Sequence, residues 1–129
     1  MNSRLNFQAE ISSRNSTINA ELTLISFEED NVFFVYCPAL DLTGYGNNEN
    51  DARDSFSQTL RMYINYTTNK KTLLKDLELH GWCVKNRRRL KSPNFDFLLK
   101  HNKQFKSIVN KRDFSKYKQE IQLPESVYT

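Results

Sequence analysis

The amino-acid sequence predicts a protein of the α+β class. Apolar and polar residues alternate over residues 5–11 and again over 18–24, which is the period of strands that bury one face. An unbroken apolar run over residues 32–37 indicates a third strand, and apolar residues then recur at helical spacing over 52–64. At 129 residues, the chain has the size of one domain that can bury a core without disulfides or metals. We therefore expect a three-stranded antiparallel meander with a covering helix, followed by a further strand.

Turn-forming residues separate the three predicted strands. Residues 14–16 predict a hairpin between the first two strands, and the acidic segment 28–31 predicts a second turn. The run at 32–37 is rich in β-branched and aromatic residues, which is typical of a strand covered on both faces. Pro38 cannot donate a hydrogen bond to a sheet and two glycines follow it, so we expect residues 38–47 to form a shaped loop.

The covering helix is expected to begin after this loop. Asn48 is a suitable N-cap, and Glu49 and Asp51 place negative charge in the first helical turn. The apolar residues of the helix fall on one face, which we expect to cover the sheet: Ala52, Phe56, Leu60, Tyr63 and Ile64.

A second, shorter helix is expected after Asn69, which would cap it. Gly81 fits the left-handed position that follows a helix end, and Trp82 fits the hydrophobic contact of a Schellman motif. A strand at residues 82–84 and a basic loop at 87–93 are expected next.

The last part of the chain has weaker patterns. Apolar residues within 95–109 predict one broken helix or two short helices with the break near Asn102, and alternation over 117–123 predicts a strand that stops at Pro124. We therefore divide the chain into an α+β domain, residues 1–84, and a basic helical C-terminal extension, residues 85–129, packed on or beside it.

Charge is distributed unevenly along the chain, which carries +4 in total. Residues 1–80 contain seven Lys/Arg and eleven Asp/Glu, a net −4, whereas residues 81–129 contain twelve and four, a net +8. A basic segment attracts polyanions, so DNA or RNA is a candidate partner of the C-terminal third, and a solvated basic surface is the alternative. The residues predicted to contact nucleic acid are Arg87, Arg88, Arg89, Lys91, Lys100, Lys103 and Lys106.

The sequence contains no phosphate-binding loop, nucleophile elbow or zinc-protease motif. His80 and His101 are isolated from each other in sequence, and Cys37 and Cys83 lack partners at zinc spacing, so we expect reduced thiols. We therefore expect no catalytic residue, no metal, no cofactor and no enzymatic activity.

Carboxylates are the usual ligands of catalytic metal ions in nucleases. A two-metal nuclease needs several acidic residues close together. Glu10, Glu21 and Asp41 are available, but the alternation places Glu10 and Glu21 on the solvent-facing side of the predicted strands. Outward charges there protect a sheet from pairing with other chains, which is the role we expect for them.

The N-terminal residues lack the apolar region of a signal peptide, and no window approaches the ~18 apolar residues of a membrane span. We therefore expect a cytoplasmic protein with no membrane partner.

One segment resembles the signature of HicB-like antitoxins. It comprises residues 36–46, Tyr-Cys-Pro-Ala-Leu-Asp-Leu-Thr-Gly-Tyr-Gly, and the helix that follows. In that family a strand runs into a Pro-x-Leu loop with glycines and then into a helix beginning Glu-Glu-Ala, for which this chain has Asn50, Asp51 and Ala52. The resemblance covers about residues 5–66. Residues 66–82 resemble the segment found in a variant of HicB-like domains that has no recognisable C-terminal DNA-binding domain.

The resemblance implies a partial RNase H-like fold without nuclease activity. It implies a protein, expected to be a homodimer, that binds and neutralises a small HicA-type toxin that cleaves mRNA, with autoregulatory nucleic-acid binding as a further property. Two alternatives remain: an orphan nucleic-acid-binding protein that uses the basic C-terminal third, and a residual RNase H-like nuclease. The expected partner-binding loop contains Pro38, Leu40, Asp41, Gly44, Tyr45 and Gly46.

Overall fold

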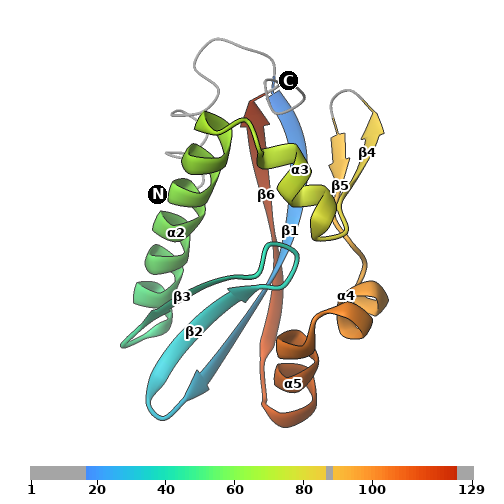
Figure 1. The fold of residues 1–129 in the computed structure, drawn as a ribbon. Coiled ribbons are helices and arrows are strands. Elements are labelled where there is room, and N and C mark those ends of the chain that lie inside the picture. The colour runs from blue at the N-terminus through green and yellow to red at the C-terminus, as the bar shows by residue number, and fades with distance from the viewer. Residues whose placement is uncertain (1–16, 87–88, 125–129) are drawn as a thin grey trace.

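The computed structural model describes residues 17–86 and 89–124, and these residues form an α+β structure (Figure 1). In chain order, the elements are β1 (Thr17–Glu29), β2 (Val32–Cys37), β3 (Leu42–Gly46), α2 (Glu49–Asn69), α3 (Leu73–Leu79), β4 (Cys83–Asn86), β5 (Arg89–Lys91), α4 (Phe95–His101), α5 (Lys103–Lys111) and β6 (Ser115–Pro124).

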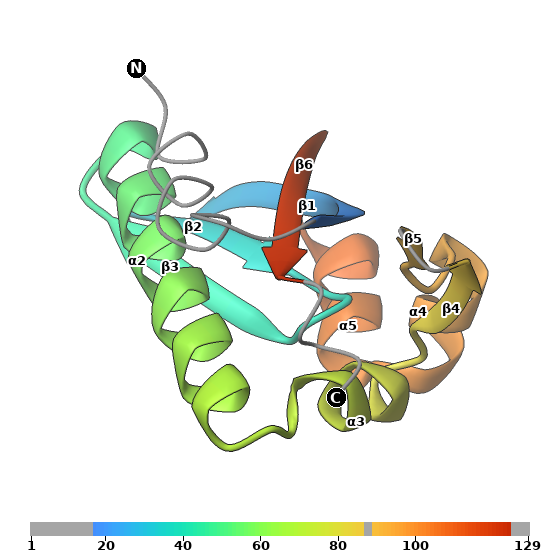
Figure 2. The same ribbon diagram turned by 90° about the horizontal axis from the view of Figure 1, so that it is seen from above.

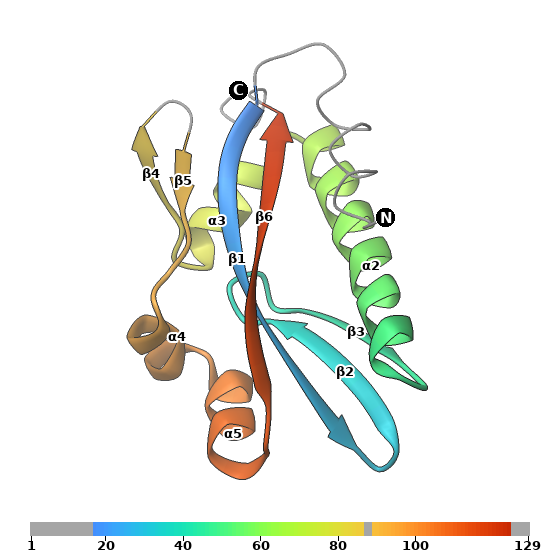
Figure 3. The same cartoon turned by 180° about the vertical axis from the view of Figure 1, so that it is seen from behind.

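The long strand β1 lies at the centre of the sheet. It pairs antiparallel with β2 over residues 25–29 and with β6 over residues 17–26. Since β3 pairs antiparallel with β2, four strands form the antiparallel order β3-β2-β1-β6. The hairpin β4–β5 joins the sheet through one parallel pair, Asn19 with Arg89. Figure 3 shows β1 and β6 running side by side, which confirms the strand predicted near the C-terminus.

The observed meander differs from the predicted one. Residues 42–46 were expected in a loop but form β3, so that prediction was wrong, and β1, β2 and β3 make up the meander. Because this strand is five residues long and contains two glycines, its composition resembles that of a loop. The strand predicted at residues 5–11 lies outside the described residues.

Gly44 and Gly46 have a different role from the one expected of them. Gly81 is the one glycine with a positive φ, at 95°. Gly44 instead lets α2 approach β3, because a Cβ atom there would lie 2.2 Å from the backbone nitrogen of Phe56. The prediction of unusual backbone at both positions was wrong, and close packing of helix on strand is the physical reason for glycine at position 44.

Helix α2 covers one face of the sheet, as predicted. Its N-cap is Asn48, whose side chain accepts a hydrogen bond from the Asp51 amide at 2.8 Å. The main core combines the buried face of this helix with inward residues of β1, β2 and β6; the helix contributes Ala52, Phe56, Leu60 and Ile64.

A second, smaller core lies on the opposite face of the sheet. Helices α4 and α5 cover Ile25 and Tyr36 there through Leu98, Phe105 and Ile108. Figure 2 shows α2 and α5 on opposite sides of β2 and β3. The prediction that the strand at 32–37 is covered on both faces is therefore confirmed, and so is the predicted helix break at residue 102.

Helix α3 ends in the predicted Schellman motif. The Trp82 amide donates to the Leu77 carbonyl and the Gly81 amide to the Glu78 carbonyl, at 3.0 and 3.1 Å. The prediction that Asn69 caps this helix was wrong, since Asn69 ends α2 and Thr72 precedes α3.

The boundary predicted after residue 84 falls inside β4. The segment beyond it supplies β5 and β6 to the sheet and α4 and α5 to its second face. The division into two parts stays a prediction.

Candidate binding surfaces

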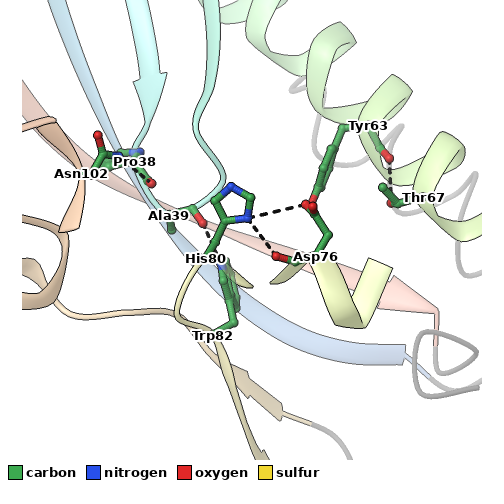
Figure 4. Close-up of polar contacts among 8 residues, drawn as sticks. All are labelled: Pro38, Ala39, Tyr63, Thr67, Asp76, His80, Trp82 and Asn102. Atoms are coloured by element: carbon green, nitrogen blue, oxygen red, sulfur yellow. Dashed lines mark hydrogen bonds and ion pairs between the residues drawn. The ribbon is translucent and has the colours of Figure 1, made fainter. Parts of the chain in front are cut away.

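The turn at residues 38–41 is held in place from two directions (Figure 4). Trp82 donates from its indole Nε1 to the Ala39 carbonyl at 2.8 Å. Asn102 donates from Nδ2 to the Pro38 carbonyl at 3.3 Å and to the Tyr36 hydroxyl oxygen at 2.9 Å. The connection between α4 and α5 and the segment after α3 therefore both fix the backbone of this turn.

Tyr36 extends this network to Asp41. The Tyr36 hydroxyl donates to Asp41 Oδ1 at 2.6 Å, and the backbone of Asp41 is left-handed with a φ of 57°. Burial of the Tyr36 side chain, with the Asp41 hydrogen bond as the next cause, raises the pKa of its hydroxyl. The hydroxyl therefore keeps its proton and remains a donor.

Most residues of the predicted partner-binding loop are covered. Pro38, Leu40 and Gly44 are buried and Gly46 is half-buried, so they shape the segment. Asp41 and Tyr45 are exposed, and the side chain of Tyr45 is 65% exposed. Of the loop residues, these two offer side chains to a partner.

Tyr45 is the open end of a row of aromatic side chains that crosses three strands. Phe27 of β1 pairs with Phe34 of β2, which pairs with Tyr45 of β3. The Phe27 and Phe34 rings stack with centroids 5.2 Å apart, and the Phe34 and Tyr45 centroids are 6.4 Å apart. We call these three residues the aromatic row. Its inner end lies beside α5, where Phe27 and Phe34 line a hollow of about 300 Å³ together with Arg112.

Exposed carboxylates gather at one end of the molecule. The β1–β2 turn and the β3–α2 connection lie at the same end of the sheet, since Phe33 pairs with both Glu28 and Gly46. Glu28 and Glu49 line one hollow of about 570 Å³ there. Lys111 and Arg112 line the same hollow, and Arg112 forms an ion pair with Glu29 at 2.7 Å. We define the acidic end by its exposed residues Glu28, Asp30, Glu49, Asp51 and Asp54, of which Glu49 forms an ion pair with Arg53 at 2.8 Å.

A second kind of surface lies on the half of the sheet that α4 and α5 leave open. Lys91 of β5 and Lys116 and Lys118 of β6 line a hollow of about 370 Å³, together with Phe95 of α4. We call this the lysine hollow. Lys118 Nζ is 3.3 Å from Glu21 Oε1, and Lys116 Nζ lies 5.5 Å from the centroid of the Phe95 ring.

The predicted nucleic-acid-binding residues are only partly brought together. Arg87, Arg88 and the side chain of Arg89 lie outside the described parts of the chain. Lys91 lies in the lysine hollow, whereas Lys100, Lys103 and Lys106 are exposed on α4 and α5. Two residues of the hollow, Lys116 and Lys118, were not predicted from the sequence. The alternation that predicted the last strand contains the signal for both, because it places positions 116 and 118 on the face opposite Tyr117 and Ile121.

The two histidines, far apart in sequence, line one further hollow of about 440 Å³ beside Asp41. His80 Nδ1 lies 2.8 Å from the Asp76 carbonyl and 3.6 Å from its carboxylate (Figure 4). Since a carbonyl only accepts, Nδ1 carries the proton in this contact. The Tyr63 hydroxyl donates to the same carboxylate.

The acidic residues considered for metal binding do not gather in the described part of the chain. Glu21 is half-buried on the polar face of β1 and paired with Lys118, and Glu10 lies outside the described residues. Within residues 17–86 and 89–124 no group of three His, Cys, Asp or Glu side chains is placed to hold a metal ion. Cys37 and Cys83 are free thiols, buried and exposed respectively.

Comparisons of the chain with protein-family models, with curated proteins and with solved structures give no match. In the part of the chain that the structure describes, no helix combines the length and the apolar character needed to cross a membrane.

Proposed function

We propose that this protein is a non-enzymatic module of the HicB-like, partial RNase H-like type that binds and neutralises a small, basic toxin of HicA type. The element order supports the proposal, because three antiparallel strands lead into a long helix and a further strand follows. The segment at residues 36–46, which resembles the HicB-like signature, also forms the contact between β3 and α2, in which Gly44 lies against the backbone of Phe56.

The exposure of Tyr45 is the observation that carries the proposal. An exposed aromatic ring that continues a row of packed aromatic rings gives a partner a large, rigid contact area at small cost in side-chain entropy. The backbone amide of Tyr45 donates to Ser55 Oγ at 3.2 Å, so at this position the edge of β3 is occupied by α2. The partner is therefore expected to contact the ring rather than to extend the sheet at this strand.

Charge favours a basic partner at the same end of the molecule. The acidic end lies next to β3, which ends at Gly46 and is joined by residues 47–48 to the start of α2 at Glu49. An mRNA-cleaving toxin must attract a polyanion and is expected to be basic. Complementary charge would speed the encounter of the two proteins and orient them.

The experiment uses the tagged full chain expressed in its native cells, with bound proteins identified at moderate salt. We expect one small basic protein in near-equal amount, which on its own arrests growth and cleaves mRNA when expressed in a test strain. Co-expression of this chain should restore growth. The Tyr45→Ala variant should fail to restore it, whereas Tyr66→Ala should succeed, because Tyr66 is equally exposed at 64% but lies on α2.

Two results would contradict the proposal. One is a captured partner that has no effect on growth or on mRNA. The other is full rescue by the Tyr45→Ala variant at an expression level equal to that of the unmodified chain.

A further inference from the structure

We propose that the lysine hollow binds single-stranded nucleic acid, with the lysines contacting phosphate groups and Phe95 stacking on a base. This site is on the face of the sheet that carries α4 and α5, and the proposal does not depend on a toxin partner. Neither Lys116 nor Lys118 belongs to the basic cluster that the sequence indicates.

The charge of the hollow favours a polyanion. Lys118 is engaged by Glu21, whereas Lys91 and Lys116 form no ion pair within the described part of the chain. Lys91 comes from β5 and Lys116 from β6, so two separate elements hold their ammonium groups around one concavity. Such an arrangement can follow a bent phosphate backbone, which a single helix face cannot do as readily.

The position of Lys118 also has a structural explanation. Glu21 and Glu120 are directly opposite each other in the pairing of β1 with β6, and like charges in that arrangement repel. Lys118 lies two residues before Glu120, on the same face of β6, and forms an ion pair with Glu21, so it relieves this repulsion. We therefore assign phosphate contact to Lys91 and Lys116 first.

Phe95 supplies the aromatic surface that a base requires. Phe95 is 40% exposed and Phe97 is 38% exposed, whereas the two leucines of the same helix reach the second core. One edge of the Phe95 ring is fixed by Phe105 in a T-shaped contact with centroids 5.4 Å apart. The ring already attracts a cation, since Lys116 Nζ lies 5.5 Å from its centroid. A base that stacks on the ring would release this ammonium group to a neighbouring phosphate.

The form of the site selects single strands over duplexes. The hollow encloses about 370 Å³ and places the aromatic ring among the lysines. In a duplex the base faces are stacked on one another and unavailable to Phe95, whereas every base of a single strand presents a face. Phosphate contact alone would be satisfied by either form, so the aromatic ring decides the preference.

Fluorescence anisotropy of the full chain with short labelled oligo(dT) and oligo(U) tests the proposal. An abasic strand of the same length separates phosphate contact from stacking, and a duplex of the same length serves as competitor. The variants are Lys91→Ala, Lys116→Ala and Phe95→Leu, the last of which keeps apolar packing against Phe105. The matched controls are Lys106→Ala, exposed on α5, and Phe97→Leu, 38% exposed on the same helix as Phe95.

We expect both single strands to bind more tightly than the duplex. Two phosphate contacts predict a slope of log K against log salt of about −1.4, and each lysine variant should reduce its magnitude by about 0.7. Phe95→Leu should weaken binding of the base-bearing strands several-fold and leave binding of the abasic strand unchanged. The relative affinities of oligo(dT) and oligo(U) then identify the natural strand.

Three results would overturn the proposal. A Lys106→Ala variant that weakens binding as much as Lys91→Ala would show diffuse charge attraction. A Phe95→Leu variant that binds as tightly as the unmodified chain would exclude stacking. Displacement by the duplex at equal concentration would remove the preference for single strands.

Discussion

Replacing Asn102 by alanine removes three hydrogen bonds at the point where α4, α5 and the 38–41 turn meet. Asn102 caps α5 by accepting from the Phe105 amide at 3.0 Å. Its Nδ2 donates to the Tyr36 hydroxyl at 2.9 Å and to the Pro38 carbonyl at 3.3 Å. All three contacts are partly buried, so their loss leaves polar groups with little access to water.

The magnitude follows from a comparison with Asn94. Asn94 caps α4 in the same manner, accepting from the Phe97 amide at 2.8 Å in an exposed position. Loss of such a cap costs about 1 kcal/mol. The two additional bonds of Asn102 each contribute about 1 kcal/mol. We therefore expect Asn102→Ala to lower the free energy of unfolding by about 3 kcal/mol and Asn94→Ala by about 1 kcal/mol.

Thermal and urea unfolding followed by circular dichroism measure the difference. For a chain of this length, the two changes correspond to decreases in Tm of roughly 10 °C and roughly 4 °C. A double-mutant cycle with Tyr36→Phe should give a coupling energy, because the Tyr36 hydroxyl accepts one of the three bonds. Equal destabilisation by Asn102→Ala and Asn94→Ala would refute the assignment of Asn102 as the residue that holds the turn.

Three further predictions concern the core. Gly44→Ala should destabilise the fold by about 2 to 3 kcal/mol in urea unfolding, since the Cβ of the alanine would lie 2.2 Å from the Phe56 nitrogen. An unchanged urea midpoint would contradict the close contact between β3 and α2. Phe56→Asp should abolish cooperative unfolding, whereas Gln58→Asp on the exposed side of α2 should not. Cooperative unfolding of both variants would show that the buried face of α2 is misplaced. Burial raises the pKa of the Cys37 thiol from 9.0 to about 12, so above pH 9.0 the unfolded chain loses a proton that the folded chain keeps. The free energy of unfolding should therefore decrease as the pH rises from about 9 to 12, by up to about 1.4 kcal/mol per pH unit for this thiol. In the Cys37→Ala variant this dependence on pH should be weaker. An unchanged dependence would contradict the raised pKa of the Cys37 thiol.

Local patterns predicted the elements that depend on neighbouring residues. The Asn48 cap, the apolar face of α2 and the Schellman motif at Gly81 each follow from residues a few positions apart, and each is present. The buried run at 32–37 also identified its own strand, because a strand covered on both faces needs no alternation.

Contacts between distant segments were not predictable in this way. Gly44 and Gly46 resemble loop residues until the helix that packs on them is known. The pairing of β6 with β1 joins residues about a hundred positions apart, and no local pattern specifies that partner. The lysine hollow was missed for the same reason, since Lys91 and Lys116 meet only through the arrangement of the sheet.

The proposed function requires a small basic protein to bind this chain at the exposed end of the aromatic row. Calorimetric titration of the captured partner into the unmodified chain and into the Tyr45→Ala and Tyr66→Ala variants measures this binding. We predict that Tyr45→Ala weakens binding by at least about 2 kcal/mol, roughly 30-fold, and that Tyr66→Ala leaves the Kd unchanged. Equal affinity of the unmodified chain and the Tyr45→Ala variant would contradict the proposed function.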